Sequence, residues 1–266
     1  MLSVCATPIG NLDDVTLRVL AELREADLVL AEDTRHTRGL LQRHGIEAKL
    51  VSYHEHNEAE RVSELLPRLL GGERLALVSD AGLPGISDPG ARLVRAAVEA
   101  GVEVTVLPGP SAVETALVAS GLVAERFAFV GFLPRKAGEL AALWEELASW
   151  DSPVVAFESP QRLPKTLRSL AESTPERQVA VCRELTKRFE EIVRGDAQEL
   201  AERFAEPPKG EITLVLGPAV AAAGGAKEAR TAVAELVAAG TPRRVAVDVV
   251  ARLAHVARNE LYRSTL

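Results

Sequence analysis

Three short segments rich in glycine and proline each follow a run of strand-type residues. They are residues 7–12 (TPIGNL), 79–90 (SDAGLPGISDPG) and 108–112 (PGPSA). In parallel α/β sheets ligands bind outside the carboxyl ends of the strands, and glycine lets the backbone approach a ligand closely. One such segment could be a plain turn, but three after successive strands predict a binding site. The helix beginning near Pro89 would offer N–H groups to an anionic group such as a carboxylate.

Other familiar kinds of site are disfavoured. Residues 7–12 lack the second and third glycines of a GxGxxG loop, which argues against a nucleotide-dependent dehydrogenase. His54 and His56 are spaced i, i+2 and would share one side of a strand, but the other ligands of a zinc site are missing, so no metal is expected. Cys5 and Cys182 lie in strand-like apolar stretches, which indicates buried, reduced thiols.

The elements that must position these segments alternate between strand and helix. Val62, Leu65, Leu66, Leu69 and Leu70 make one stripe of a helix. Strand-like runs cover residues 27–31, 74–79, 102–107, 127–131, 153–157, 178–182 and 211–216. The alternation predicts a mostly parallel sheet covered on both faces, and the pattern restarts after Pro110. The sequence therefore predicts an α/β fold with two domains, residues 1–110 and 111–217.

A different composition begins at Gly217. Residues 217–226 (GPAVAAAGGA) are small and indicate a linker, and beyond them come three short helical patterns. The pair Thr241 and Pro242 is typical of an N-cap followed by proline at the first helical position. Residues 226–266 are therefore expected to form a small helical domain with a helix-turn-helix outline.

Composition and charge restrict the kinds of partner. The chain has 266 residues, of which 47% are hydrophobic and 26% charged, enough for a real core. No apolar run approaches the ~20 residues that cross a bilayer, and no charged leader opens the chain, so we expect a cytoplasmic protein without a membrane partner. The net charge is −7, yet residues 226–266 carry +3 and the remainder −10. A basic segment on an acidic body favours an RNA-docking appendage.

Ten segments, taken together and in order, resemble one known family. They are residues 7–18, 31–37, 52–58, 79–90, 108–112, 131–136, 158–163, 183–187, 209–211 and 257–266. The combination resembles the bacterial small-subunit ribosomal RNA 2′-O-methyltransferases, which belong to the tetrapyrrole-methylase superfamily. Two positions depart from that pattern. Leu83 stands where threonine is expected, which could alter a hydrogen bond to the cofactor, and Gln161 stands where histidine is usual.

The resemblance implies a fold, a cofactor and a reaction. Two α/β domains of the tetrapyrrole-methylase type would hold S-adenosylmethionine in the cleft between them. The reaction would be 2′-O-methylation of a cytidine in the decoding region of 16S ribosomal RNA, presented as naked RNA or as a small ribosomal subunit. A homodimer is implied, and no DNA partner is expected. The cofactor-binding positions carried over by motif are Pro8, Asp80, Gly82, Pro84, Gly85, Ser111, Ala112, Glu158 and Leu185.

A ribose hydroxyl is a poor nucleophile while protonated, so the implied reaction calls for a positioned base. The candidates are Asp33 and His36 in the AEDTRHT segment, and Glu184 and Lys187 in RELTK. Lys187 could serve only if its surroundings lower its pKa. Alternatively, Asp33 caps the following helix, and Glu184 with Lys187 forms a surface ion pair. Asp80 has a similar alternative as a helix cap or turn-maker. The sequence leaves these roles open.

RNA contacts are expected in basic loops and in the C-terminal segment. The candidates are Arg35, His54, His56, Arg135, Lys136, Arg243, Arg244 and Arg258. Solvated surface positions are the ordinary alternative for each. Two other functions remain open: methylation of a tetrapyrrole on the same scaffold, and RNA binding without catalysis. The first would be accompanied by a glycine-rich loop where this chain has residues 7–14, and the second does not explain the glycine-rich loops.

Overall fold

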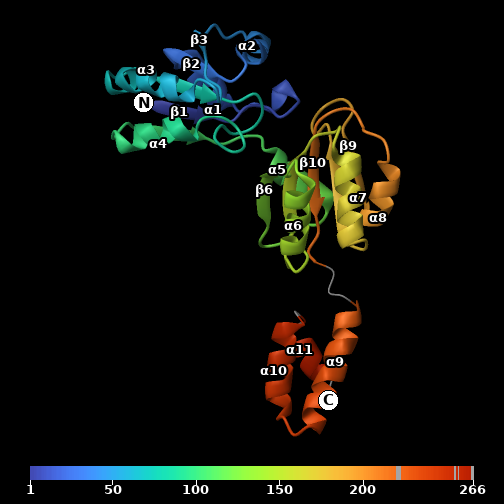
Figure 1. Cartoon of the computed structure of the whole chain (residues 1–266). Helices are drawn as coiled ribbons and strands as arrows, with labels where there is room; N and C mark the ends of the chain where they lie inside the picture. Colours follow the sequence, from blue (N-terminus) through green and yellow to red (C-terminus); the bar gives the residue numbers. More distant parts are fainter. Residues whose placement is uncertain (220–222, 255, 257, 265–266) are drawn as a thin grey trace.

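The computed structural model describes residues 1–219, 223–254, 256 and 258–264. In chain order, two α/β domains are followed by three helices at the C-terminal end (Figure 1). Each α/β domain contains one five-stranded sheet. Within the described residues, no helix is long and apolar enough to cross a membrane.

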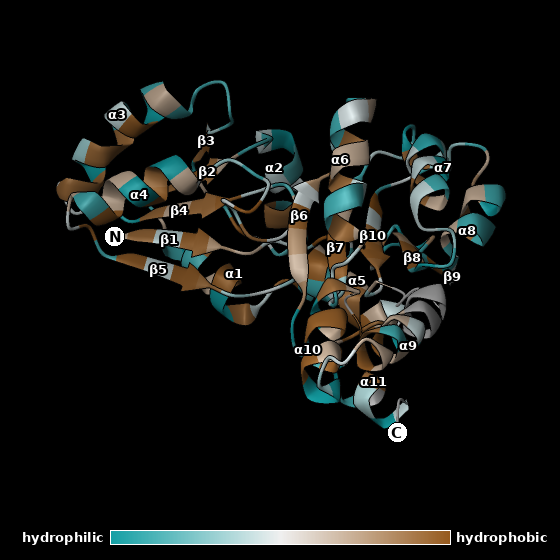
Figure 2. Cartoon of the chain, turned by 60° about the horizontal axis from the view of Figure 1, so that its bottom comes forward, coloured by the Kyte–Doolittle hydropathy of each residue, from teal (hydrophilic) through white to brown (hydrophobic). Residues whose placement is uncertain are grey.

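The first sheet is entirely parallel, with strand order β3-β2-β4-β1-β5. Its strands are β1 (Leu2–Cys5), β2 (Leu28–Ala31), β3 (Leu50–Ser52), β4 (Leu75–Val78) and β5 (Val104–Leu107). The three central strands are buried along their whole length, as expected of a parallel sheet with both faces covered. Figure 2 shows these apolar strands beside helices whose outer sides are hydrophilic. The prediction of a covered parallel sheet is therefore confirmed for this domain.

Two pairs of helices cover the two faces of this sheet. Buried leucines of α1 (Leu17–Glu25) and α2 (Thr34–Arg43) pack on one face, and those of α3 (Glu58–Leu70) and α4 (Ala91–Glu99) pack on the other. A short 3₁₀ helix, η1 (Leu12–Asp14), precedes α1. Because the strands are parallel, the loops that follow β1, β2, β4 and β5 all leave from the carboxyl ends of the strands. The glycine-rich segments lie in the loops after β1, β4 and β5.

The second sheet is mixed, which corrects the expectation of a mostly parallel one. Its order is β6-β7-β10-β8-β9, and only β6 and β7 run parallel. The strands are β6 (Ala128–Phe132), β7 (Val154–Glu158), β8 (Gln178–Arg183), β9 (Glu191–Asp196) and β10 (Ile212–Leu216). Strand β9, which was not predicted, follows β8 without an intervening helix. A short connection of this kind joins antiparallel strands, whereas a parallel pair needs a longer crossover.

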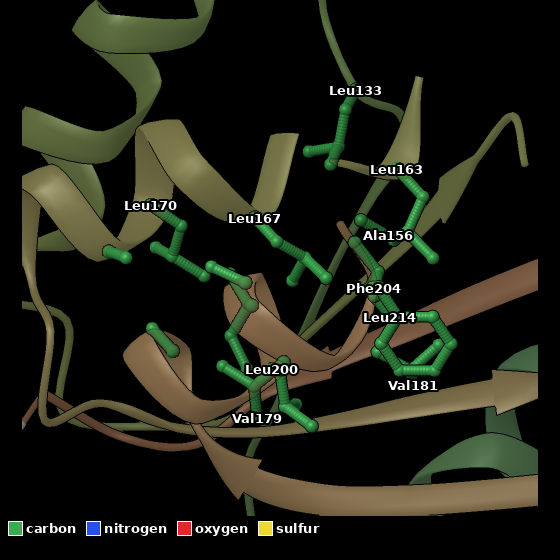
Figure 3. Close-up of a cluster of buried hydrophobic side chains, with 14 of the residues drawn as sticks. Leu133, Ala156, Leu163, Leu167, Leu170, Val179, Val181, Leu200, Phe204 and Leu214 are labelled. Carbon is green, nitrogen blue, oxygen red and sulfur yellow. The ribbon is translucent and has the colours of Figure 1, made fainter. Parts of the chain in front are cut away.

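The main core of the second domain lies on one face of this sheet. Leucines of α7 (Leu163–Ser173) and α8 (Ala197–Arg203) pack on buried valines of β8 and on β10, as Figure 3 shows for Leu167, Leu200 and Val181. Helix α6 (Ala137–Leu147) adds Trp144 to this cluster. The opposite face is covered by α5 (Ala112–Ser120), which directly follows the third glycine-rich segment.

The two α/β domains touch along a narrow strip. Ile9, from the first domain, is buried in the cluster of α5 together with Cys182 and Leu185. Gly10 lies so close to the second domain that a Cβ there would be 2.5 Å from Cγ of Lys187 and 2.8 Å from the carbonyl oxygen of Leu185. The next residue, Asn11, donates its backbone N–H to Oγ1 of Thr186 at 3.0 Å. Only glycine fits at this point of the strip.

The C-terminal helices are α9 (Ala223–Ala238), α10 (Arg243–Leu253) and α11 (Arg258–Ser264). They share a buried cluster of their own, which includes Val233, Val247 and Leu261. Helix α10 begins at Arg243, with Pro242 as its cap residue and no side-chain cap bond, so the predicted capping by Thr241 is off by one residue. The division into residues 1–110, 111–217 and 226–266 stays a proposal. The first boundary falls between β5 and α5, and the second predicted domain ends between β10 and α9. Residue 226 lies inside α9, which begins at Ala223, so the predicted linker runs too far.

Candidate functional site

A cavity of about 420 Å³ lies where the two α/β domains meet. The first domain lines it with Ile9, Glu32, Asp80, Ala81, Gly82, Leu83, Ile86, Ser87 and Asp88. The second part of the chain adds Ser111, Ala112, Val113, Phe132, Phe157, Glu158, Ser159, Pro160, Cys182, Leu185, Glu211, Ile212 and Thr213. The strand-end loops of the first sheet therefore open onto the second domain. The site that the glycine-rich segments predicted thus lies in the interdomain cleft that the family resemblance implied.

The loop at residues 79–90 is held to the loop after β1 by a small antiparallel bridge. The N–H of Thr7 donates to the carbonyl of Gly82 at 2.8 Å, and the N–H of Gly82 donates back at 3.0 Å. The hydroxyl of Thr7 also donates to the carbonyl of Ser79 at 3.0 Å. Gly82 has φ +79°, a conformation that favours glycine, and so the bridge fixes one wall of the cavity at a position where a side chain would be strained.

The first N–H donor at the N-terminus of α4, that of Gly90, is already bonded within the protein. The N–H of Gly90 donates to a carboxylate oxygen of Glu58 at 2.8 Å, and the hydroxyl of Tyr53 donates to the same oxygen at 3.1 Å. The expectation that this helix end would receive an external carboxylate is therefore wrong for Gly90. An internal carboxylate takes its place, and this explains why Tyr53 and Glu58 occur together in the SYHEHNE segment.

Three carboxylates gather on the wall that the first domain contributes. Burial, and next the negative charge of Asp80, raise the pKa of Glu32, which follows β2. Burial, followed by the charge of Glu32, raises the pKa of Asp88 to about 6. Asp80 accepts the N–H of Asp33 at 3.0 Å through one carboxylate oxygen, so it joins the loops after β2 and β4 as well as lining the cavity. The first domain thus presents crowded negative charge to the cavity.

The second domain contributes a mainly apolar wall with one buried acid. The rings of Phe132 and Phe157 meet edge to face, with their centroids 5.4 Å apart. Glu158 is buried and accepts hydrogen bonds from the N–H of Ser159 at 2.5 Å, Nε of Arg162 at 2.7 Å and the hydroxyl of Thr166 at 2.5 Å. Its carboxylate therefore braces the turn after β7. Burial raises the pKa of the Cys182 thiol to about 12, so this cavity residue stays protonated.

Six of the nine predicted cofactor positions line the cavity, and three do not. The six are Asp80, Gly82, Ser111, Ala112, Glu158 and Leu185. Pro8 and Pro84 are buried. Gly85 has φ +86°, and a Cβ added there would lie 3.5 Å from the backbone N atom of Ala91. These three residues shape the loops rather than forming the wall, and their predicted contact with a cofactor stays a prediction.

The four candidate bases lie outside the cavity lining. Asp33 caps α2, accepting the N–H of Arg35 at 2.8 Å, and its bonds to the Arg35 side chain, which also pairs with it, lower its pKa to about 2. His36 is exposed on α2. Neither residue lines the cavity. Asp33 is a weak base paired with Arg35, and His36 lies on the surface.

Glu184 and Lys187 form the ion pair that the sequence offered as their alternative role. Nζ of Lys187 lies 3.0 Å from Glu184 and 2.9 Å from Glu211. Partial burial alone would lower the pKa of Lys187, but its bonds to Glu211 and Glu184 outweigh this and the net shift is upward. The condition for a lysine base is therefore not met. The pKa of Glu184 is lowered, mainly because its carboxylate accepts the N–H of Glu211.

Several of the predicted RNA-contact residues have partners within the protein. Arg35 pairs with Asp33 at 2.9 Å, and the rings of His54 and His56 lie edge to face with centroids 6.0 Å apart. Others are exposed, namely Arg135, Lys136, Arg243, Arg244 and Arg258. Lys136 pairs with Glu139 and Arg258 with Asp248. Among the described residues, no group of histidine, cysteine and carboxylate side chains could hold a metal ion.

Three residues other than glycine adopt positive φ in the described chain, and all lie beside this junction. They are Ser87 at 62°, Glu184 at 53° and Thr186 at 64°. Ser87 lines the cavity, and the other two flank Leu185, which also lines it. Non-glycine residues rarely adopt this conformation, and strain of this kind concentrates at functional sites.

Several residues of the cavity lining were not predicted from the sequence. Glu32, Ser87, Asp88, Phe132 and Phe157 all line the cavity. Glu32 was within reach, because it is the first residue after β2 and strand-end positions face the ligand in such sheets. No local signal marked the two phenylalanines, which read as ordinary strand residues.

Comparison with known proteins agrees with this architecture. The family described as Tetrapyrrole (Corrin/Porphyrin) Methylases matches residues 1–201. The chain belongs to this family. Among solved structures, the methyltransferase CobJ superposes with a TM-score of 0.63 at 22% identity, over 82% of this chain and 94% of that one. A uroporphyrin-III C-methyltransferase from Thermus thermophilus, complexed with S-adenosylhomocysteine, has a TM-score of 0.57 at 21% identity, covering 81% of this chain and 96% of that one. At these identities the likeness shows the fold.

Curated relatives are considerably more similar in sequence. The Ribosomal RNA small subunit methyltransferase I of Mesorhizobium japonicum is 44% identical over 268 residues, covering all of this chain and 91% of the relative. The protein of the same name from Thermotoga maritima is 46% identical over 216 residues, covering 81% of this chain and 97% of the relative. The resemblance to this group of family members is therefore confirmed.

The carboxylate wall predicts a pH-dependent stability effect of Asp88→Asn. The folded protein keeps Asp88 protonated up to about pH 6, whereas an unperturbed aspartate ionises near 3.8. Raising the pH between these values therefore destabilises the fold, because the folded state binds the extra proton. The asparagine side chain of the variant does not ionise and escapes this cost, so the variant should gain more thermal stability over wild type at pH 8 than at pH 4.

The measurement is the unfolding midpoint by circular dichroism at both pH values. Asp151→Asn is the matched control, because the Asp151 side chain is 79% exposed. It should show no such difference. An Asp88→Asn effect of the same size at both pH values would contradict the prediction that ionisation of Asp88 destabilises the fold.

Proposed function

We propose that this chain transfers a methyl group from S-adenosylmethionine to 16S ribosomal RNA, at the 2′-hydroxyl of a cytidine in the decoding region. The observation that carries this proposal is the cavity at the domain junction, in a chain whose full-length relatives are named Ribosomal RNA small subunit methyltransferase I. The likeness to a structure complexed with S-adenosylhomocysteine supports the choice of cofactor. The RNA, rather than a tetrapyrrole, is favoured by those relatives' names.

The cavity has the chemistry that S-adenosylmethionine requires. Its aromatic and aliphatic wall, with Phe132, Phe157 and Leu185, suits a flat adenine ring. The carboxylates of Asp80 and Glu32 suit a cationic ammonium group on the opposite wall. Helix α5 begins at the cavity and Ser111 makes no side-chain cap bond, so its first N–H groups suit a carboxylate. When bound, the cofactor supplies a methyl group already activated by its sulfonium.

What remains for the protein is to align the ribose hydroxyl and to take its proton. We propose Asp88 as the base that receives this proton on its carboxylate. It lines the cavity, and burial with the neighbouring charge of Glu32 brings its pKa to about 6, close to working pH, where a base is most effective. Glu32 then acts through Asp88 by keeping its pKa raised.

Two further parts of the proposal concern assembly. Residues 226–266 dock RNA, supported by the exposed Arg243 and Arg244 at the start of α10. A second copy of the chain covers the edge strands β5 and β6, where Val106 on β5 is 51% exposed and Val123 and Phe127, in the segment before β6, are 58% and 40% exposed. Unpaired strand edges with exposed apolar side chains favour association.

Gly82→Val tests the cofactor site. A branched side chain at φ +79° would enter the cavity wall, so S-adenosylmethionine binding should weaken at least tenfold by calorimetric titration. Gly72→Val is the matched control, because Gly72 has φ +92° and a Cβ there meets nothing within 4 Å. Both variants carry the backbone strain, but only one touches the cavity. Equal loss of binding in both, or in neither, would count against the cofactor location.

The product of the reaction tests the proposed chemistry. Protein, S-adenosylmethionine carrying a labelled methyl group and unmethylated small ribosomal subunits should give labelled 16S RNA. The labelled position should resist alkaline cleavage, because 2′-O-methylation removes the hydroxyl that attacks the phosphate.

Parallel incubations separate the alternatives. Naked 16S RNA shows whether assembly of the subunit matters, and a chain ending at Gly217 should bind the cofactor but label subunits poorly. Label on a base would contradict the 2′-hydroxyl assignment. Transfer to a tetrapyrrole with no RNA labelling would overturn the substrate, and RNA binding without transfer would indicate a non-catalytic factor.

The assignment of Asp88 predicts the pH profile of methyl transfer. Activity at saturating substrate should rise as the pH passes about 6, because the base must be ionised. Asp88→Asn should lower kcat about 100-fold. Glu32→Gln should raise KM for S-adenosylmethionine, because a carboxylate that faces its ammonium group is lost. At saturating cofactor it should shift the rise toward lower pH, because the charge that raises the pKa of Asp88 is gone. Asp33→Asn should not change the pH profile, because Asp33 does not line the cavity. A wild-type profile without the rise near pH 6 would exclude Asp88 as the base.

A further inference from the structure

A second hollow adjoins the strip that joins the two α/β domains. It encloses about 610 Å³, and we call it the junction groove. Its lining is Gly10, Asn11, Leu12, Asp13 and Arg43 from the first domain, and Thr186, Lys187 and Arg188 from the second. Ile9 and Leu185 line the cavity, and the residues next to them in sequence line the groove. A substrate strand that places one nucleotide in the cavity would therefore pass close to the groove.

The groove lining carries two arginines that an anion could reach. Lys187 also lines the groove but is paired with Glu184 and Glu211, and Asp13 is the one carboxylate in the lining, so Arg43 and Arg188 are the cations available to a ligand. Arg43 pairs with Asp13 at 3.0 Å, and both side chains are more than half exposed, at 56% and 59%. Solvent screens the attraction in an exposed pair of this kind, although the Arg43 guanidinium contacts both carboxylate oxygens of Asp13. Arg188 is exposed, and no ion pair to it is found in the part of the chain that the structure describes.

An aromatic side chain stands beside these cations. Phe189 is 65% exposed, and the guanidinium of Arg188 lies 5.5 Å from the centre of its ring. Single-stranded RNA is commonly held in this way, with cations along the phosphates and an exposed aromatic ring on which an unpaired base stacks. A duplex offers no free base face to such a ring.

The groove wall is held in a fixed shape. Thr186, a β-branched residue at φ 64°, is in a conformation that costs energy unless its surroundings impose it. Its N–H donates to Glu190 at 2.6 Å, and its hydroxyl accepts the N–H of Asn11 at 3.0 Å. These bonds order residues 186–189 before any ligand arrives, which lowers the entropic cost of binding.

We propose that the junction groove binds the backbone of single-stranded RNA beside the nucleotide that enters the cavity. Arg43 and Arg188 contact phosphates, and Phe189 stacks on an unpaired base. This inference rests on the proposed function, because it takes the substrate to be RNA. It adds a binding surface that none of the segments predicted to contact RNA includes.

The test is the affinity of the full chain for fluorescein-labelled single-stranded oligocytidine, followed by anisotropy over a range of salt concentrations. Phe189→Leu should raise Kd about tenfold through lost stacking. Arg188→Gln should raise Kd and reduce the slope of log K against log salt by about 0.7, the share of one phosphate contact on a single strand. Arg95→Gln is the matched control. Arg95 is exposed on α4, lines neither hollow, and its loss should leave Kd and slope near wild type.

Each of the other outcomes contradicts the proposal that the groove binds RNA. If wild type binds RNA and labels subunits while the groove variants bind equally well, the groove inference fails and the proposed function stands. If wild type neither binds RNA nor labels subunits, both fail. If sedimentation shows that Arg188→Gln or Phe189→Leu changes the oligomeric state, the groove is a contact between copies of the chain. Unchanged unfolding midpoints of both variants exclude misfolding as the cause of weak binding.

Discussion

The contact of Gly10 with the segment around Leu185 is the constraint on which the site depends. A side chain at position 10 would overlap Cγ of Lys187, Oγ1 of Thr186 and the Leu185 carbonyl, so the two domains meet at backbone distance. The cavity and the junction groove both adjoin this strip. Widening the strip would separate the carboxylate wall from the apolar wall. Glu184 and Thr186, which flank Leu185 at this strip, both adopt left-handed backbone conformations.

The carboxylate wall requires bracing, because crowded negative charges repel one another and resist burial. The first domain supplies this bracing with uncharged donors and long-range contacts. The N–H of Asp33 bonds to Asp80, and Thr7 and Gly82 bridge two strand-end loops. Glu58 holds the end of the same loop through the N–H of Gly90. The raised pKa of Asp88 is therefore a property of the assembled loops rather than of its own segment.

Much of this architecture follows from local pattern, and the exceptions have physical reasons. Buried parallel strands are nearly continuous apolar runs, so β1, β2 and β4 were evident from sequence. Strand β9 (EIVRGD) is half polar and lies at a sheet edge, and it carries too weak a pattern to be predicted. The direction of β10 was not evident either, since strand residues look alike in parallel and antiparallel pairs.

The site shows the same division between local and long-range information. Six positions of the cavity lining were predicted because motifs carried them over. Asp88 needed the fold, since its raised pKa comes from burial and then from the charge of Glu32, 56 residues away in the chain. Adjacent acids in AEDTRHT make the point most directly. Asp33 turns toward α2, caps it and pairs with Arg35, which makes it a weak base. Glu32 still belongs to the strand end and faces the cavity, where burial strengthens its basicity. One step along the backbone therefore separates a structural carboxylate from one that can tune chemistry, and only the end point of β2 decides which is which.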